Sequence, residues 1–420
     1  MSQTQPLAFI TKGDLVNPET KRHPSAFYAR LRQQGPLTRL PDFLGNGSDG
    51  WLVTHYDDVI ALLKDPRFIK DMRKYARQQT GLPGSGATVV ADSQSSLVER
   101  FAWRRDMLTS DPPDHTRLRH LASKAFTPRM IEQLRPRIQQ ITDELLDAVE
   151  SKGEMDLIAE FAFPLPITVI SEMLGIPQAD RHLFRAWTQE ILNSTGQADS
   201  TAIIAAEGDF IQYLKDLLVS KRAQPGNDLV SEMLQVKEQG DELSEDELIS
   251  TIWLLIVAGH ETTVNLIGNG TLTLLQHPDQ LDLLRRDSSL IVAAVEELLR
   301  YTGPVSLSSL RWADEDIVMH NQLIHKGDLV LVSLISANTD PQQFTDPDVL
   351  DLTRQINKHL AFGKGIHVCL GAPLARLEGQ IAFETLLRRL PNLQLVGNPE
   401  QLGWNLSLIL RGLTGLPVTF

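Results

Sequence analysis

The longest helix candidate in this chain starts near Ser244 and reaches Pro278 with no proline between them. Its first residues, Ser244-Glu245-Asp246-Glu247, have the serine and the glutamate of a helix-starting capping box. About thirty residues at 1.5 Å each form a rod of roughly 45 Å, long enough to cross a domain of this size. Residues Leu254–Ala258 in its middle are apolar on all sides, which predicts a buried helix.

Hydrophobic periodicity predicts a mainly α-helical fold with a small β-sheet region. Most segments after Asp57 have helical spacing, and Ile131–Val149 carries one continuous apolar stripe. Short β-branched or aromatic runs predict the strands, at Leu37–Leu40, Trp51–His55, Ile317–His325, Leu329–Leu334 and Leu406–Phe420.

Charge and composition narrow the class of protein. The formal net charge of −13 argues against nucleic acid as a general partner. Met1–Thr20 has no apolar run, so it is expected to be neither a signal peptide nor a membrane anchor. With a single cysteine in 420 residues, a cytoplasmic protein that does not associate with membranes is the simplest expectation.

Polar residues interrupt the apolar middle of the long helix, in the segment Ala258-Gly259-His260-Glu261-Thr262-Thr263. An acid and two threonines are costly inside a buried helix, and threonine is a mediocre helix former. One interpretation is a satisfied polar patch, in which the threonine hydroxyls bond to carbonyls one turn earlier. The other is a functional site, where such local rules are commonly broken.

The single cysteine, Cys369, lies in Phe362-Gly363-Lys364-Gly365-Ile366-His367-Val368-Cys369-Leu370-Gly371. It cannot form an internal disulfide. Three roles remain for it, namely packing, nucleophilic chemistry with His367, or metal ligation. The glycines permit positive φ and leave little side-chain bulk, which suits a tight loop pressed against a large flat group. A thiolate that ligates iron fits this pattern.

These two segments resemble the haem-binding loop and the acid–alcohol motif of cytochrome P450 enzymes of the soluble bacterial type. The resemblance implies one P450 domain over residues 1–420, with haem b (iron protoporphyrin IX) between the long central helix and the Cys369 loop. It also implies that the Cys369 thiolate ligates the iron, and that Glu261 and Thr262 deliver protons during oxygen activation.

Further site residues follow from the same resemblance. Arginine and histidine are suited to the two haem propionates. Glu297 and Arg300 match the family's Glu-x-x-Arg pair and are interpreted as structural. The implied cofactor-binding residues are His115, Arg119, Ala258, Arg311, Phe362, Gly363, His367, Cys369 and Gly371.

The resemblance implies a monooxygenase that inserts one atom of O2 into a hydrophobic small molecule, by hydroxylation or epoxidation. Polyketides, macrolides, steroids and terpenes are all candidate substrates. The candidate substrate contacts are Val305, Leu307, Ser308, Ser309 and Leu408. The segments expected to face substrate are Leu82–Met107, Thr188–Ala205, Leu254–Thr262, Val305–Leu310 and Leu406–Leu410.

Electrons are expected to come from separate ferredoxin and reductase proteins, because one cysteine cannot hold an iron–sulfur cluster. His115–Arg129 carries Arg117, Arg119, Lys124 and Arg129 without an acid, so it is a candidate docking surface for an acidic ferredoxin. A solvated helix face is the alternative. The chain is expected to act as a monomer.

Three other functions compete with the monooxygenase. A peroxide-driven hydroxylase and a non-catalytic haem-binding sensor are both disfavoured by the acid–alcohol pair Glu261-Thr262. A Cys-His hydrolase is disfavoured by the glycine pattern around Cys369 and by the lack of a nucleophile-elbow context.

Overall fold

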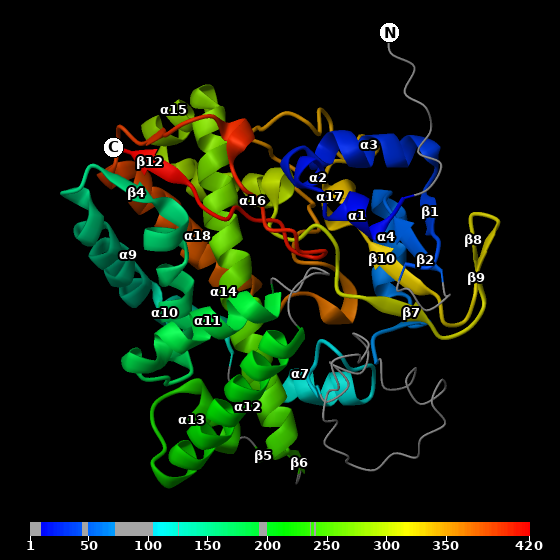
Figure 1. Cartoon of the computed structure of the whole chain (residues 1–420), viewed down its shortest axis with the longest axis horizontal. Helices are drawn as coiled ribbons and strands as arrows, with labels where there is room; N and C mark the ends of the chain where they lie inside the picture. The colour runs from blue at the N-terminus through cyan, green and yellow to red at the C-terminus, as the bar shows by residue number, and fades with distance from the viewer. Residues whose placement is uncertain are drawn as a thin grey trace. The chain divides into compact units, whose positions relative to one another are not determined.

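The structure, a computed structural model, describes residues 10–43, 49–71, 104–124, 126–192, 200–235, 237–238 and 241–420 (Figure 1). The chain divides into two compact units, each described here by itself. The first unit comprises Met1–Ile69, Arg135–Leu165 and Glu261–Phe420, and the second comprises Lys70–Leu134 and Pro166–His260.

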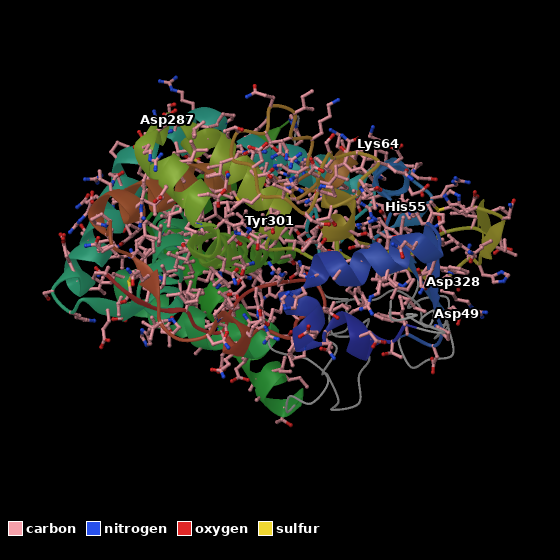
Figure 2. All side chains as sticks on the ribbon, turned by 90° about the horizontal axis from the view of Figure 1, so that it is seen from above. Asp49, His55, Lys64, Asp287, Tyr301 and Asp328 are labelled. Atoms are coloured by element: carbon pink, nitrogen blue, oxygen red, sulfur yellow. The ribbon has the colours of Figure 1, made fainter. Side chains whose placement is uncertain are left out.

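A five-stranded sheet with the order β1-β2-β10-β7-β3 lies in the first unit. The strands are β1 (Leu37–Leu40), β2 (Gly50–Val53), β10 (Leu329–Val332), β7 (Arg311–Ala313) and β3 (Phe68–Ile69). β2 and β10 pair in parallel, with Gly50 opposite Leu329, and the other neighbours are antiparallel. Asp49 and Asp328 lie at the same end of this sheet (Figure 2), where the Trp51 indole donates to Asp328 at 2.8 Å.

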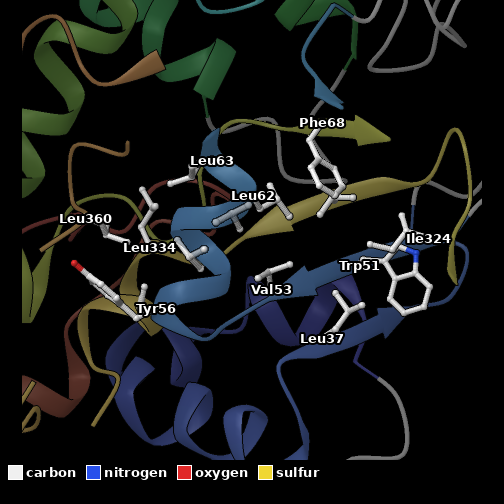
Figure 3. Close-up of a cluster of buried hydrophobic side chains, with 14 of the residues drawn as sticks. Leu37, Trp51, Val53, Tyr56, Leu62, Leu63, Phe68, Ile324, Leu334 and Leu360 are labelled. Atoms are coloured by element: carbon white, nitrogen blue, oxygen red, sulfur yellow. The ribbon is translucent and has the colours of Figure 1, made fainter. Parts of the chain in front are cut away.

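Helix α4 (Tyr56–Lys64) follows β2 directly and packs its apolar side into the core of this sheet (Figure 3). Val59, Leu62 and Leu63 are all at most 3% exposed. This burial matters for the site, because a Cβ at Gly365 would come within 2.6 Å of the Leu63 carbonyl oxygen. α4 therefore forms the support on which the glycine-rich loop rests.

Two smaller sheets complete the strands of the first unit. One has the order β11-β12-β4 and the other is the β8-β9 hairpin. Their bounds are β4 (Glu154–Asp156), β8 (Ile317–Met319), β9 (Gln322–Ile324), β11 (Gln394–Leu395) and β12 (Pro417–Thr419).

A second apolar core of the first unit includes Leu266, Leu298 and Phe383. The helices of this unit are α1 (Lys12–Leu15), α2 (Pro18–Arg22), α3 (Pro24–Gln34), α4, α9 (Arg135–Glu150), α15 (Pro278–Arg286), α16 (Ile291–Thr302), α17 (Leu334–Asn338) and α18 (Ala372–Arg389). Short 3-10 turns occur at Ser288–Leu290, Gly365–His367 and Pro399–Gln401, and a π-turn at Ile158–Ala162.

Where the structure describes the second unit, its regular elements are helices and one short hairpin, β5 (Lys237–Glu238) and β6 (Asp241–Glu242). Its helices are α7 (Asp114–Lys124), α8 (Pro128–Gln133), α11 (Arg181–Leu192), α12 (Ser200–Ala223) and α13 (Leu229–Gln235), with a 3-10 turn at Gln178–Asp180. Trp187 of α11 stacks on Phe210 of α12 with ring centres 5.4 Å apart, which fixes this helix pair.

Helices α10 (Pro164–Met173) and α14 (Glu245–Gln276) contribute residues to both units. α14 contains 32 residues and is therefore about 48 Å long. The predicted capping box is confirmed, since the Ser244 amide donates to Glu247 at 2.9 Å and the Glu247 amide donates to Ser244 at 3.3 Å.

The prediction of a mainly helical fold with a small β region is confirmed, with two local differences. The apolar stripe Ile131–Val149 spans two helices, because α8 ends at Gln133 and α9 starts anew at Arg135, one residue before Pro136. Only residues 417–419 of the predicted strand segment Leu406–Phe420 form a strand. Among the described helices, none has the length and hydropathy needed to cross a membrane.

Candidate active site

Cys369 is exposed at the end of a loop whose backbone depends on glycine. Gly363 and Gly365 have φ values of 71° and 77°, a region that favours residues without a Cβ. The Cys369 amide donates to the Phe362 carbonyl at 3.0 Å, which closes the loop. Gly371 is the N-cap of α18, so the thiol lies near the positive end of an 18-residue helix, where a thiolate is favoured.

Phe362, at the start of this loop, is held by charged groups of α16 and α18. The Arg376 guanidinium lies 4.5 Å from the centre of the Phe362 ring. Arg376 also donates to both carboxylate oxygens of Glu296, at 2.6 and 2.8 Å, and His359 lies 3.0 Å from that carboxylate. Burial alone would raise the pKa of Glu296, but hydrogen bonds from His359 and Arg376 outweigh it and lower this pKa to about 2.

The first unit also holds the other predicted haem contacts that follow α14 in sequence. Arg311 is buried in β7, and its guanidinium donates to the Phe68 carbonyl at 3.2 Å. His367 is half-buried in the short turn two residues before Cys369. Both are cationic or polar side chains of the kind that binds carboxylates.

Glu261 and Thr262, the predicted acid–alcohol pair, are half-buried on α14. Burial raises the pKa of Glu261 to about 7. A carboxyl group with this pKa can both hold and release a proton near neutral pH, which suits proton transfer.

The second unit contains the remaining predicted cofactor residues. His115 is buried in α7, and Arg119 is half-buried one turn later on the same helix face. Ala258 is exposed on α14, although Ile256 and Val257 before it are buried. An apolar residue exposed in the middle of a long buried helix marks a surface that an apolar group can cover.

His260 is a polar residue of the motif segment to which the sequence analysis gave no role. It is fully buried, with Nδ1 2.7 Å from the Ile256 carbonyl oxygen and Nε2 3.4 Å from the Thr188 hydroxyl of α11. Burial lowers the pKa of His260 to about 4, so the ring is neutral at physiological pH. Its position directly before Glu261, in an otherwise apolar stretch of the helix, was the available signal.

Glu378 of α18 is a second polar residue that the sequence analysis did not select. It is 1% exposed, and burial raises its pKa to about 8, partly offset by a hydrogen bond from Thr263 of α14. Only its spacing from apolar neighbours at 374, 377 and 381 could have marked it as buried.

Glu297 and Arg300 form a fully buried ion pair in α16, with nitrogen–oxygen distances of 2.7 and 2.8 Å. Arg354 donates to both oxygens of Glu297 at 3.2 Å, and Arg300 donates to the Asn338 carbonyl at 3.0 Å. The pair ties α16 to the end of α17 and to the segment that follows it. Its geometry is that of a structural bridge.

The candidate substrate residues differ in exposure. Leu307 is fully buried and Ser308 is 9% exposed, so their side chains offer little surface to a substrate. Val305, Ser309 and Leu408 are half-buried and keep accessible surface. The predicted segment Leu82–Met107 lies outside the described residues up to residue 103, as do residues 193–199 of Thr188–Ala205.

Comparisons with known proteins identify the family of this chain. Residues 167–397 match the family model of cytochrome P450. The chain is 54% identical to cytochrome P450 CYP107DY1 of Priestia megaterium over 98% of this chain and 99% of that protein.

The chain belongs to the cytochrome P450 family.

Two other relatives extend the match. This P450 is 43% identical to 6-deoxyerythronolide B hydroxylase of Saccharopolyspora erythraea over 93% of this chain and 94% of that protein. The solved structure of PksS, the P450 of the Bacillus subtilis 168 bacillaene polyketide synthase, superposes with a TM-score of 0.86. Its identity is 41%, and the match covers 96% of this chain and 98% of that one.

The cofactor of this P450 is haem, and the described residues fit it. Cys369 and its apolar neighbour Val368 are both exposed, and a Cβ at Gly363 would meet nothing within 4 Å. The loop thus presents a thiol beside open, apolar surface, as a flat macrocycle with a thiolate-ligated iron requires. The P450 is accordingly a monooxygenase that uses O2 and a small-molecule substrate.

Proposed function

We propose that this P450 oxidises a hydrophobic secondary metabolite of the polyketide or macrolide kind. The observation that carries the proposal is the pair Glu261-Thr262, next to the exposed Ala258 on α14. An acid with a pKa of about 7 beside a hydroxyl is suited to move protons, which a carrier or sensor does not need. The relatives that hydroxylate 6-deoxyerythronolide B or serve a polyketide synthase support the substrate class.

Each predicted site residue has a proposed role. Haem, when bound, activates O2 for insertion of one oxygen atom into the substrate. The Cys369 sulfur ligates its iron, the loop residues Phe362, Gly363 and Gly371 hold that sulfur in place, and Glu261 and Thr262 hold and transfer protons. His115, Arg119, Arg311 and His367 would bind the propionates, and the small side chain of Ala258 would leave space for the cofactor.

The apolar and small polar surface near Val305, Ser309 and Leu408 supports a largely hydrophobic substrate with a few oxygen groups. Leu307 and Ser308 support the backbone of that region, since the Ser308 amide donates to the Val332 carbonyl at 2.9 Å. We propose that all 420 residues act as one catalytic domain, as a monomer in the cytoplasm.

A ferredoxin-type protein is the proposed electron donor. Lys124 and Arg129 are exposed in and after α7, so their charges are accessible to an acidic partner. Arg117 is less accessible than the sequence suggested, because it forms an ion pair with Glu247 of α14. The proposed docking surface therefore centres on Lys124 and Arg129.

A peroxide-driven hydroxylase is the second candidate function. The two can be separated by incubating purified holoenzyme with a polyketide and macrolide panel, either with ferredoxin, reductase and NAD(P)H or with hydrogen peroxide alone. The proposal predicts product from one or more macrolides with the reductase system and O2. Product with peroxide alone, or no product from any polyketide, would contradict it.

A further inference from the structure

The segment 404–413 near the C-terminus is a narrow hairpin whose turn, Leu406–Leu410, contains the candidate substrate contact Leu408 (Figure 1). Trp404 pairs with Leu413 across the hairpin, and Leu410 pairs with Val305. We call residues 406–410 the substrate loop. Its side chains are exposed or half-buried, so what holds it must lie at its base.

Two basic side chains hold that base through reciprocal hydrogen bonds. Lys21 of α2 donates from Nζ to the Leu410 carbonyl at 2.9 Å. Arg411, the next residue, donates from Nε back to the Lys21 carbonyl at 2.6 Å. Lys21 is 1% and Arg411 6% exposed, so these bonds are formed away from water and are correspondingly strong.

Helix α14 contacts the same base through two asparagines. Asn269 donates to the Arg411 carbonyl at 2.9 Å. Asn265 packs so closely on Gly412 that a Cβ there would overlap its side-chain amide. Both lie on the face of α14 that carries Thr262, because spacings of three and seven residues return to one side of a helix.

This arrangement lowers the stability of the folded protein. Neither Lys21 nor Arg411 forms an ion pair with an acidic side chain in the part of the chain that the structure describes. Arg411 is instead satisfied by the Thr302 hydroxyl at 2.8 Å and by the face of the Trp404 ring at 4.3 Å. A buried lysine and a buried arginine without an acid cost more than apolar side chains would, and such violations are typical of functional regions.

We propose that Lys21, Arg411 and Asn269 are positioning residues that fix the substrate loop relative to the turn of α14 that carries Thr262. They thereby determine which part of a bound substrate is oxidised. The inference rests on the proposed function, in which the loop contacts substrate and Thr262 acts in proton transfer. None of the three residues needs to touch the substrate. Lys21 and Asn269 act through the backbone carbonyls of residues 410 and 411, and Arg411 acts through the Lys21 carbonyl.

Hydrogen exchange tests the positioning step without any substrate. In holoenzyme with Lys21→Met, a side chain of similar length fills the site but cannot donate to Leu410. Amides at the base of the hairpin, such as that of Arg411, should exchange roughly tenfold faster than in the parent, because their bonds open more often. Lys12→Met changes an exposed lysine of α1 and should leave this exchange unchanged. Unchanged exchange at 405–414 in Lys21→Met would overturn the proposal.

Ligand titration tests the link to the pocket. 1-Dodecylimidazole ligates haem iron and places its alkyl chain in the substrate pocket, whereas imidazole only ligates the iron. Lys21→Met should weaken dodecylimidazole about tenfold and imidazole less than about twofold, since only the longer ligand reaches the loop. Equal effects on the affinity of both ligands, or no effect on either, would show that Lys21, Arg411 and Asn269 do not act on the substrate region.

Gly412→Ala tests the same step by a steric route. The new methyl group must displace either the hairpin or Asn265, so it should reproduce the selective loss of dodecylimidazole affinity. Gly208→Ala is the matched control, because a Cβ at Gly208 would meet nothing within 4 Å. If Gly412→Ala binds both ligands as the parent does, the contact with α14 has no positioning role. If the parent protein shows no thiolate ligation of haem iron, the proposed function is wrong. The hydrogen-exchange result would still decide whether Lys21, Arg411 and Asn269 fix the substrate loop.

Discussion

Arg376 covers the Phe362 ring at 4.5 Å while its guanidinium is paired with Glu296, so a charged group of α18 braces the first residue of the Cys369 loop. The Phe362 carbonyl in turn accepts the Cys369 amide at 3.0 Å. The Cys369 loop is therefore closed by the backbone bond between Phe362 and Cys369 and is braced at Phe362 by the cation–π contact.

Arg376→Gln should make haem dissociate faster by roughly tenfold, because it removes two charge-assisted hydrogen bonds and the contact with Phe362. The rate can be followed by haem transfer to excess apomyoglobin. Arg388→Gln changes an exposed arginine of the same helix and should leave the rate unchanged. Equal rates for Arg376→Gln and the parent would show that the brace does not hold the loop.

Thr262→Ala should keep haem and substrate binding but lower the product formed per NAD(P)H by roughly tenfold, with the remaining electrons released as peroxide. The variant removes the hydroxyl that is proposed to take part in proton transfer, whereas the helix and the apolar surface remain. Thr262→Ser retains the hydroxyl and should recover most of the yield. A Thr262→Ala enzyme as well coupled as the parent would exclude this role.

Lys124→Glu combined with Arg129→Glu should slow reduction by an acidic ferredoxin roughly tenfold at low ionic strength. The defect should shrink near 1 M salt, where charges are screened beyond about 3 Å. Stopped-flow reduction measures the rate. The pair Lys12→Glu and Arg286→Glu makes the same change of net charge at other exposed sites and serves as the control. If both pairs slow reduction equally, net charge and not docking is responsible.

The buried Lys21 should make the free energy of unfolding depend on pH. Burial, and secondarily the charge of Arg411, lower its pKa from 10.5 to about 7. Between those pH values the unfolded chain binds more protons than the folded one, so this lysine makes stability rise with pH, by at most about 1.4 kcal/mol per unit. Urea unfolding of the parent and Lys21→Met at about pH 7.5 and about pH 9 isolates the effect. The variant should lack this increase, and an equal rise in both proteins would assign the dependence to other groups.

The sequence predicted those helices and loops whose formation depends on residues close together in the chain. The capping box at Ser244 and the apolar run after it define α14, and the glycines around Cys369 define a loop that other residues cannot form. The break between α8 and α9 was missed because the apolar stripe continues across it, and only Pro136 indicated an interruption.

Contacts between distant segments could not be predicted. Lys21 and Leu410 are 389 positions apart, and neither has a neighbour pattern that indicates the other. The burial of Leu307 next to the half-buried Val305 likewise depends on pairing with Ser333 of a different segment. Such features follow from tertiary packing, which periodicity does not report.

The most direct test of the central claim is the absorption spectrum of the reduced protein with carbon monoxide, for the parent and for Cys369→Ser. If the Cys369 thiolate ligates haem iron, the parent gives the long-wavelength Soret band of thiolate ligation, and Cys369→Ser loses it while the fold is retained. A Soret band that is the same in both proteins would show that another residue holds the iron.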